Sequence, residues 1–366
     1  PSARAGGVPS TTVAAETSGP VEGAGAGFAP KRPKPRAFSI ESAWTLRAGV
    51  VDDRETARGG EGVGGRGVGG QAGEEVVLTL GDGHVLDLGG GSVQVSQVDG
   101  RKLGRTMSRP LGAVRMTERF LPRQRATRAD LKALRKHVVR ELDDVGWLER
   151  IGGRMVGIGG TIRTLAAMHQ RRSGYPLDEI HGYLLTRDGL EELVDDMAEL
   201  PARERGRLPA LKQDRADITL AGAVVISTAL ERLSVDQIEI CAQGLREGIF
   251  YERFLAPAEP PLIGDVRRQS VLNLVDIYRC ERPHAEQVTA LALAVYDELA
   301  RLGLHALEHP ERDLLWAAGM LHDAGVMVDY NDHHKHGYYL VLNAGLPGFR
   351  HRELALVALL VRSHRK

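Results

Sequence analysis

A proline-rich segment at residues 256–261, APAEPP, divides this sequence into two parts with different hydrophobic patterns. Before it, short apolar runs alternate with longer segments that carry apolar residues at helical spacing, which is typical of an α/β fold. After it, every periodic segment has helical spacing, which indicates an all-α part. Because proline can continue neither a helix nor a central strand, we expect a linker at 257–265 and a separate core on each side.

The first 75 residues differ from both of these parts. They are rich in glycine, above all at 59–70, and have almost no apolar periodicity. Such a composition buries too little apolar surface to offset the entropy of the chain, so we expect residues 1–75 to be mostly disordered. Only residues 38–51 have the composition of a short helix or strand.

Residues 76–256 contain the elements of an α/β domain. Three strands separated by glycine-containing turns form an antiparallel meander, and later strands and helices alternate along the chain. The predicted strands are 76–80, 85–88, 92–98, 155–158 and 237–241. The predicted helices are 128–145, 162–171, 187–199, 215–233 and 245–254. For the all-α domain at 266–366, the predicted helices are 270–278, 284–302, 313–321, 337–343 and 352–363.

Charge and cysteine usage exclude several classes of function. The 48 Lys and Arg residues equal the 48 Asp and Glu residues, so no net charge directs the chain to nucleic acid or to an anionic membrane. Cys241 and Cys280 lie far apart without metal-site spacing, which suits a reducing compartment. We find neither a membrane-spanning run nor a signal peptide, and we expect a cytoplasmic protein with no nucleic-acid or membrane partner.

Two glycine-rich turns in the α/β part are candidates for phosphate binding. The first, DLGGGS at 87–92, lies between two predicted strands, and the second, GIGGT at 157–161, lies between a strand and a helix. Free amides at such turns and at helix starts bind anions, and an aspartate beside them can hold a divalent cation against the same phosphate. Taken alone, each turn could equally be an ordinary structural turn.

Other segments, together with these turns, resemble the exopolyphosphatase and guanosine pentaphosphatase (Ppx/GppA) family. LGAVRMTERF at 111–120 is similar to the segment that follows the first turn in that family. RAD at 215–217, with AGA at 221–223, is similar to one of the family's helices. GLREG at 244–248 matches a further element of the family. The resemblance covers residues 84–366. It implies an actin-like, ribonuclease H-like α/β domain, of which 76–256 form the second subdomain, followed by an HD-type helical domain at 266–366. We expect the helical domain to be truncated, since the sequence ends within a basic run.

The resemblance also implies an activity and a site. A hydrolase of this family releases the terminal phosphate of inorganic polyphosphate or guanosine pentaphosphate, with Mg²⁺ or another divalent cation and with water as the nucleophile. Asp87 would position Mg²⁺, and Arg215 would reach the phosphate chain. The family also implies a homodimer. The phosphate would be cradled by Gly89, Gly90, Gly91 and Ser92 in one turn and by Gly159, Gly160 and Thr161 in the other.

The sequence departs from the family at two points. Gln94 stands where the family has a glutamate, and an amide cannot accept a proton as a base, although we still assign Asp87 and Gln94 as the catalytic pair. Residues 1–83 show no counterpart of the family's first subdomain with its catalytic glutamate, so a truncated gene start is one expectation. The alternative function is therefore a non-catalytic protein that binds polyphosphate or an alarmone. An actin-like kinase is disfavoured, because the GLREG and HD-like segments are not kinase features.

Histidines gather in the helical part. His322-Asp323, with His284 earlier in the chain, resembles the HD motif of metal-dependent phosphohydrolases, and HHKHGYYL at 333–340 and RSHRK at 362–366 resemble segments of the Ppx/GppA family. We predict a candidate second metal site of His284, His322, Asp323 and His336, since imidazole and carboxylate ligands from several helices suit a divalent metal. Three alternatives stay open: the histidines only pack the helices, they line a basic groove for a polyphosphate tail with Lys335, Arg362, Arg365 and Lys366, or this site alone carries the chemistry.

Overall fold

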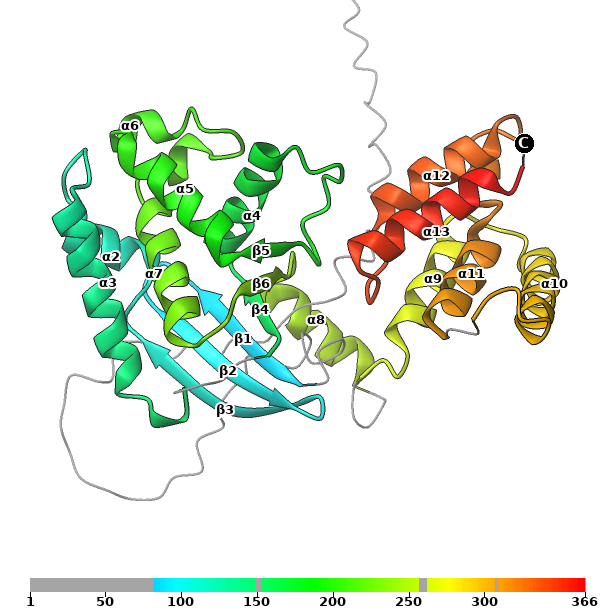
Figure 1. Cartoon of the computed structure of the whole chain (residues 1–366), viewed down its shortest axis with the longest axis horizontal. Helices are drawn as coiled ribbons and strands as arrows, with labels where there is room; N and C mark the ends of the chain where they lie inside the picture. The colour runs from blue at the N-terminus through cyan, green and yellow to red at the C-terminus, as the bar shows by residue number, and fades with distance from the viewer. Residues whose placement is uncertain (1–81, 149–152, 257–261, 307–308, 366) are drawn as a thin grey trace, which may run out of the picture. The chain divides into compact units, whose positions relative to one another are not determined.

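The computed structural model describes residues 82–148, 153–256, 262–306 and 309–365 (Figure 1). Within these ranges, all strands lie before residue 241, and residues 266–363 form helices and turns only. The predicted strand at 76–80, the segment 38–51 and the disorder predicted for 1–75 lie outside the described residues. No helix within the described ranges is long and apolar enough to span a membrane.

The α/β part is built on a mixed sheet of six strands, in the order β3-β2-β1-β4-β6-β5 (Figure 1). β1 pairs with β4 in parallel, as β4 does with β6, and the other neighbours are antiparallel. Because β1 and β4 are parallel, the turns that follow them lie at the same edge of the sheet. The strands are β1 (Gly83–Leu88), β2 (Val93–Asp99), β3 (Lys102–Arg109), β4 (Met155–Ile158), β5 (Leu184–Thr186) and β6 (Gln237–Ile240).

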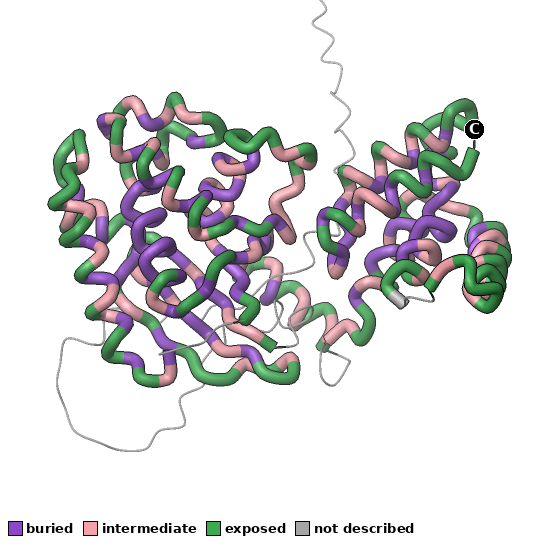
Figure 2. The backbone as a smooth tube through the Cα atoms, viewed as in Figure 1, coloured by how far each residue is buried: buried purple, intermediate pink, exposed green. Residues whose placement is uncertain are grey.

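The helix α7 (Thr219–Arg232) lies at the centre of this part. Every residue from 219 to 230 is buried, as Figure 2 shows, which explains why its sequence is apolar on all sides. It packs against α2, α3, α4 and α5, and its core is continuous with the inward side chains of β1 and β2, such as Leu86 and Val95. The other helices here are α2 (Ala113–Phe120), α3 (Arg128–Asp143), α4 (Gly160–Ser173), α5 (Arg187–Glu199), α6 (Ala202–Arg205) and α8 (Leu245–Leu255).

Most of the predicted elements of this part are confirmed, and the differences have local causes. α3 begins as expected because Thr127 and Asp130 form a capping box that satisfies both of their backbone amides. α7 begins at Thr219, not at Arg215, which ends a 3₁₀ turn. The Asp217 carboxylate accepts a hydrogen bond from the Ile218 amide, and such local bonds compete with helix formation. The predictions did not include α2, α6, β3 or β5.

The helical part has a core of its own, formed by residues such as Val271, Leu321, Val341 and Val357. α9 begins four residues before the predicted start, because the Asp265 side chain caps it by accepting a hydrogen bond from the Arg268 amide. α12 also begins earlier than predicted. The helices are α9 (Val266–Ile277), α10 (Arg282–Arg301), α11 (His309–Leu321), α12 (His333–Ala344) and α13 (His351–Ser363).

Candidate active site

The two glycine-rich turns lie side by side at one edge of the sheet. Asp87 on β1 is opposite Ile158 on β4, so the turns that follow these strands are neighbours. Gly159 has φ of 107°, which favours glycine, and a Cβ at this position would lie 2.6 Å from the Leu88 carbonyl oxygen. The same Cβ would lie 3.2 Å from Asp87 Oδ1. The second turn therefore rests directly on the aspartate that opens the first.

The first turn is closed by its own backbone and held by α2. The Gly89 amide donates to the Ser92 carbonyl at 3.0 Å, and the carbonyls of Gly89 and Gly90 accept hydrogen bonds from the Ala113 and Val114 amides at 3.0 Å each. The first amides of α2, which a helix leaves without internal partners, are thus satisfied by the turn. The segment 111–120, a motif in the sequence, therefore holds the first glycine-rich turn in place.

Gly112 brings α2 close to this turn. A Cβ at position 112 would collide with backbone atoms of Gly90 and Gly91, so only glycine fits there without a backbone shift. Gly90 and Gly91 are both exposed, and no described residue accepts a hydrogen bond from either of their amides. Their N–H groups are therefore available to an anion.

The second turn combines a helix start with an arginine. Gly160 and Thr161 are the first residues of α4, whose opening amides and dipole favour a negative charge. The Arg215 guanidinium lies against Gly160, and a Cβ at position 160 would collide with it. Arg215 is half-buried and pairs with no carboxylate in the described ranges. Gly222 of α7 lets that helix pack closely on the Thr161 side chain.

Asp87 and Gln94, predicted as a catalytic pair, are direct cross-strand partners on β1 and β2. Residues opposite each other in antiparallel strands project from the same face of the sheet, with Cβ atoms about 4.5–5.5 Å apart. Burial raises the pKa of the Asp87 carboxyl to about 6, and the positive charge of Arg163 partly opposes this shift. Arg163, on the first turns of α4, was not among the residues predicted from the sequence, because only the pairing of β1 with β4 brings it near Asp87.

These residues fit a divalent cation bound by oxygen ligands. Asp87 is half-buried, and it has no ion-pair partner in the part of the chain that the structure describes. A buried carboxylate with a raised pKa is stabilised in its charged form by a nearby cation. The amide oxygen of Gln94 offers a neutral second ligand on the same face, and oxygen ligands of this kind suit Mg²⁺.

Two family models match the sequence of this chain. Residues 73–256 match the family model described as "Ppx/GppA phosphatase family", and residues 266–366 match "Ppx/GppA phosphatase, domain III". The chain belongs to the Ppx/GppA phosphatase family.

Relatives of this Ppx/GppA chain include an enzyme and several solved structures. The chain is 24% identical over 288 residues to the guanosine-5'-triphosphate,3'-diphosphate pyrophosphatase of Pseudoalteromonas translucida, which covers 77% of this chain and 54% of that protein. It thus spans about half the length of that curated relative. A solved Ppx/GppA family member from Aquifex aeolicus is 31% identical, with a TM-score of 0.46 over 50% of this chain and 60% of that one. An exopolyphosphatase from Cytophaga hutchinsonii is 21% identical, with a TM-score of 0.44 over 49% and 60%.

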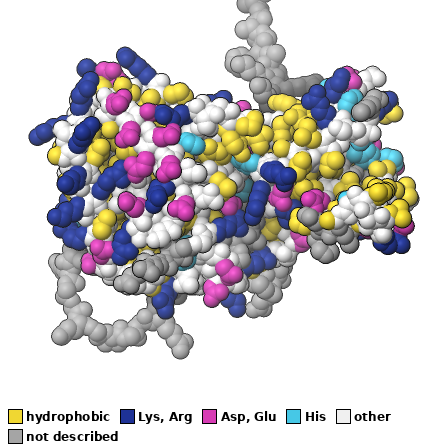
Figure 3. All heavy atoms as spheres, viewed as in Figure 1, with side chains coloured by type: hydrophobic (Ala, Val, Ile, Leu, Met, Phe, Trp, Pro, Cys, Tyr) yellow, Lys and Arg dark blue, Asp and Glu magenta, His cyan; other side chains and the backbone are white. Residues whose placement is uncertain are grey.

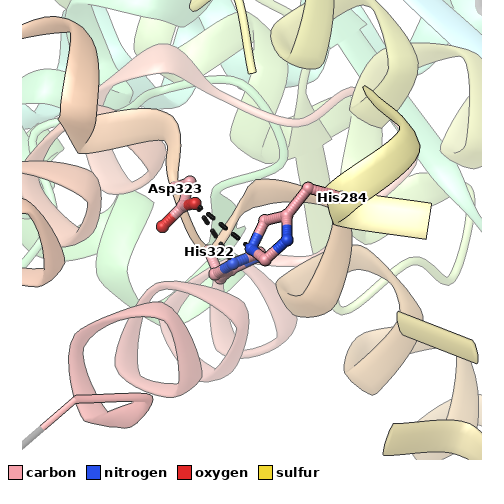
Figure 4. Close-up of side chains that lie close together, drawn as sticks. All are labelled: His284, His322 and Asp323. Atoms are coloured by element: carbon pink, nitrogen blue, oxygen red, sulfur yellow. Dashed lines mark ion pairs between the residues drawn. The ribbon is translucent and has the colours of Figure 1, made fainter. Parts of the chain in front are cut away.

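The helical part of this Ppx/GppA chain contains a cluster of histidines around Asp323. His284, His322 and Asp323, which the sequence grouped as a candidate metal site, lie together, and Figure 4 shows both rings beside the Asp323 carboxylate. His333 and His364 complete a second group on the same carboxylate. His336, the fourth residue of the predicted set, belongs to neither group of neighbouring donor atoms among the described residues.

The charges of this cluster are coupled. Burial lowers the pKa of His322, but its hydrogen bonds to Asp323 and to the Gly319 carbonyl outweigh this effect, so the net shift is upward. The hydrogen bond from His322 lowers the pKa of Asp323.

On the rest of the surface, Figure 3 shows acidic and basic side chains interspersed over the α/β part, so charges of one sign do not gather on the face in view.

Proposed function

We propose that this chain is a phosphoanhydride hydrolase that releases the terminal phosphate of inorganic polyphosphate or of guanosine pentaphosphate. The single observation that supports this most strongly is the placement of both glycine turns, Asp87 and Arg215 at one edge of the sheet. The activity for which the Pseudoalteromonas translucida relative is named supports the alarmone as one of the two substrates. Both substrates present the same chemistry, a terminal phosphoryl group on a polyanionic chain.

The backbone of the two turns binds the terminal phosphoryl group. The exposed amides of Gly90 and Gly91 and the first amides of α4 donate to its oxygens. The Arg215 guanidinium, beside Gly160, neutralises the charge that these oxygens carry in the transition state. Fixed donors of this kind are worth most where charge develops during the reaction, because they need no reorganisation.

Asp87 and Gln94 act on the attacking water. In the chain without a bound cation, burial raises the pKa of the Asp87 carboxyl to about 6, so it is ionised at neutral pH and basic enough to orient water and take up its proton. Gln94, directly opposite, can hold the water through its amide but cannot accept a proton. When bound, Mg²⁺ or another divalent cation held by Asp87 and the Gln94 amide oxygen would supply further neutralisation of the phosphate charge.

A non-catalytic binding protein is the second candidate, and Gln94 is the observation that favours it. An amide beside Asp87 leaves a single carboxylate at the turns, where the family resemblance implies two. Such a protein would bind polyphosphate or the alarmone through the same amides and Arg215 without releasing phosphate.

The two candidates are separated by measuring phosphate release and equilibrium binding on the same purified chain, with polyphosphate and guanosine pentaphosphate in MgCl₂. We expect release of terminal phosphate, and we expect Arg215→Ala to weaken substrate binding by about 10–100-fold, since a charge-assisted hydrogen bond contributes about 1.5–3 kcal/mol. Arg171→Ala, at the far end of α4 from the turns, is the matched control and should leave binding unchanged. Binding without release would establish the second candidate, and the absence of both would overturn the phosphate site.

We also propose that the protein acts in the cytoplasm as a homodimer, with no nucleic-acid or membrane partner. The two candidate substrates are soluble anions, and the balanced charge of 48 basic and 48 acidic residues supports a local and not a global attraction to them. Light scattering on the purified chain tests the dimer.

A further inference from the structure

Four histidines from different helices surround the carboxylate of Asp323. His284 Nε2 on α10 lies 3.6 Å from Asp323 Oδ2, and His322 Nε2, just after α11, lies 3.4 Å from the same oxygen (Figure 4). His333 Nε2, at the start of α12, lies 3.3 Å from the other oxygen, Oδ1. His364, at the end of α13, completes this second side, with its Nε2 3.0 Å from that of His333. Oδ2 therefore has two histidines beside it, and Oδ1 has His333, which lies against His364.

Hydrogen bonds to the backbone fix which ring nitrogen of these histidines carries a proton. The Nδ1 atoms of His322, His333 and His364 lie 2.7, 2.8 and 2.6 Å from the carbonyl oxygens of the residues three positions before them. A carbonyl oxygen only accepts, so each Nδ1 carries a hydrogen, and in the neutral ring Nε2 bears a lone pair. This arrangement, in which Nδ1–H binds a backbone carbonyl, is the one by which proteins orient metal-binding imidazoles.

In the neutral state, the Nε2 lone pairs of His333 and His364 converge without a donor between them. His333 Nε2 and His364 Nε2 face each other at hydrogen-bond distance, although both are acceptors in the neutral state. Both also lie beside the Asp323 carboxylate, which is itself an acceptor. Acceptors held together in this way require a cation or additional protons between them.

The spacing of these atoms matches the coordination sphere of a metal ion. Two ligands at about 2.0–2.1 Å from one ion, at angles near 90–110°, lie about 2.9–3.4 Å apart. The nitrogen–nitrogen distance of 3.0 Å and the nitrogen–oxygen distances of 3.3 and 3.4 Å fall within this range, and the 3.6 Å distance of His284 is slightly above it. Imidazole nitrogens with one carboxylate suit Zn²⁺, Mn²⁺, Fe²⁺, Co²⁺ or Ni²⁺ better than Mg²⁺ or Ca²⁺, which take oxygen ligands.

We propose that Asp323 and the histidines on its two sides, His284 with His322 and His333 with His364, bind divalent transition-metal ions, with the Asp323 carboxylate shared between the two groups. The site draws its ligands from the ends of four helices, and it is partly open, since His284 and His364 are exposed while His322 and His333 are buried. An open position of this kind leaves room for water or an anionic ligand on the ion. The site is independent of the phosphate turns, so failure of one proposal leaves the other standing.

The test is metal binding by the untagged full chain. Protein freed of metal by EDTA is equilibrated with Zn²⁺ or Co²⁺ and desalted, and bound metal is measured by mass spectrometry and, for Co²⁺, by its visible absorption. We expect at least one ion per chain, and a loss of affinity of at least tenfold in Asp323→Asn and in His333→Ala. His336→Ala is the matched control, because this residue lies on the same helix outside both donor groups, and it should bind metal as the unmodified chain does.

Two results would overturn the proposal: an unmodified chain that retains no metal after desalting, or an Asp323→Asn variant that retains as much as the unmodified chain. Circular dichroism establishes that each variant is folded. If Asp323→Asn does not fold, His364→Ala serves in its place, since this side chain lies at the exposed end of α13 and its removal leaves the helical core intact. The same loss of at least tenfold is expected for it.

Discussion

The turns at the sheet edge and the histidine cluster in the helical part are opposite in electrostatic design. At the turns, hydrogen-bond donors converge: the amides of Gly90 and Gly91, the start of α4 and the Arg215 guanidinium. Around Asp323, groups that accept hydrogen bonds in their neutral or ionised state converge: a carboxylate and three imidazole rings whose other nitrogen donates to a backbone carbonyl. The polarity of the unsatisfied groups, and not merely their clustering, therefore indicates whether a site takes an anion or a cation.

The two sites also differ in what positions them. The proposed anion site is made chiefly of backbone, so its glycines determine its shape. The proposed cation site is made of side chains, three of which are oriented by single hydrogen bonds to backbone carbonyls. Substitutions at each site should therefore have different consequences for binding and for stability.

The first prediction concerns Asp87→Asn, which should separate activity from stability. Phosphate release should fall by roughly 10²–10⁴-fold, the usual contribution of a positioned base. The free energy of unfolding at pH 7.5 should nevertheless rise, on the order of 2 kcal/mol, because burial disfavours the charged carboxylate.

The pH dependence of this stabilisation has a definite sign. The pKa of Asp87 is raised to about 6 in the folded chain, so the stability of the unmodified protein falls as pH rises from about 4 to about 6. The gain from Asp87→Asn should be full above pH 6 and vanish near pH 4, as measured by urea unfolding at both ends of this range. A gain that is independent of pH would contradict the buried carboxylate.

The second prediction tests the dependence of the anion site on its backbone. Gly112→Ala places a methyl group against Gly90 and Gly91 and should cost on the order of 2–3 kcal/mol of stability while it abolishes polyphosphate binding. Gly146→Ala is the matched control, since a Cβ there meets no atom within 4 Å. Chemical denaturation and a binding titration of both variants provide the measurement, and equal behaviour of the two would refute the close approach of α2.

The third prediction concerns Gln94→Glu, which places a second carboxylate directly opposite Asp87. In EDTA, like charges in this position should destabilise the fold by about 0.2–1 kcal/mol. In Mg²⁺ the variant should bind the cation more tightly than the unmodified chain and release phosphate several-fold faster. Thermal unfolding with and without Mg²⁺ measures the first effect, and an unchanged response to Mg²⁺ would argue against cation binding at this pair.

The smallest expected effect is the absence of crosstalk between the two sites. Arg215→Ala should leave Zn²⁺ affinity unchanged, and Asp323→Asn should leave polyphosphate affinity unchanged. In the double variant, the changes in binding free energy should equal the sum of those in the single variants within about 0.5 kcal/mol. Parallel titrations of the three variants measure this, and a coupling above that limit would mean that one ligand acts on both sites.

The sequence predicted much of the fold and part of each site. The α5 helix (Arg187–Glu199) was predicted with both bounds correct, because its apolar spacing is regular and Thr186 caps it. α2 was missed, since only two of its residues are buried and no side chain caps it, and β5 was missed because it is only three residues long. Elements of this size leave little periodic signal in a sequence.

For the sites, too, the sequence could not predict contacts that depend on which strands or helices pack together. The proximity of the two turns follows from strand order and could be expected from motif spacing, but the approach of Arg163 to Asp87 depends on which strands pair. In the helical part, the histidine at 336 was as plausible a ligand from spacing as His333 and His364. Only the packing of α12 against α13 brings His333 and His364 together across 31 positions of the sequence.

Backbone amide resonances, followed while tripolyphosphate is added, show whether both turns bind one anion. The resonances of Gly90, Gly91, Gly160 and Thr161 should shift together with a single Kd, and those of a distant turn such as Asp99-Gly100 should not move. Shifts confined to one turn, or two different Kd values for the two turns, would contradict the binding of one anion by both turns.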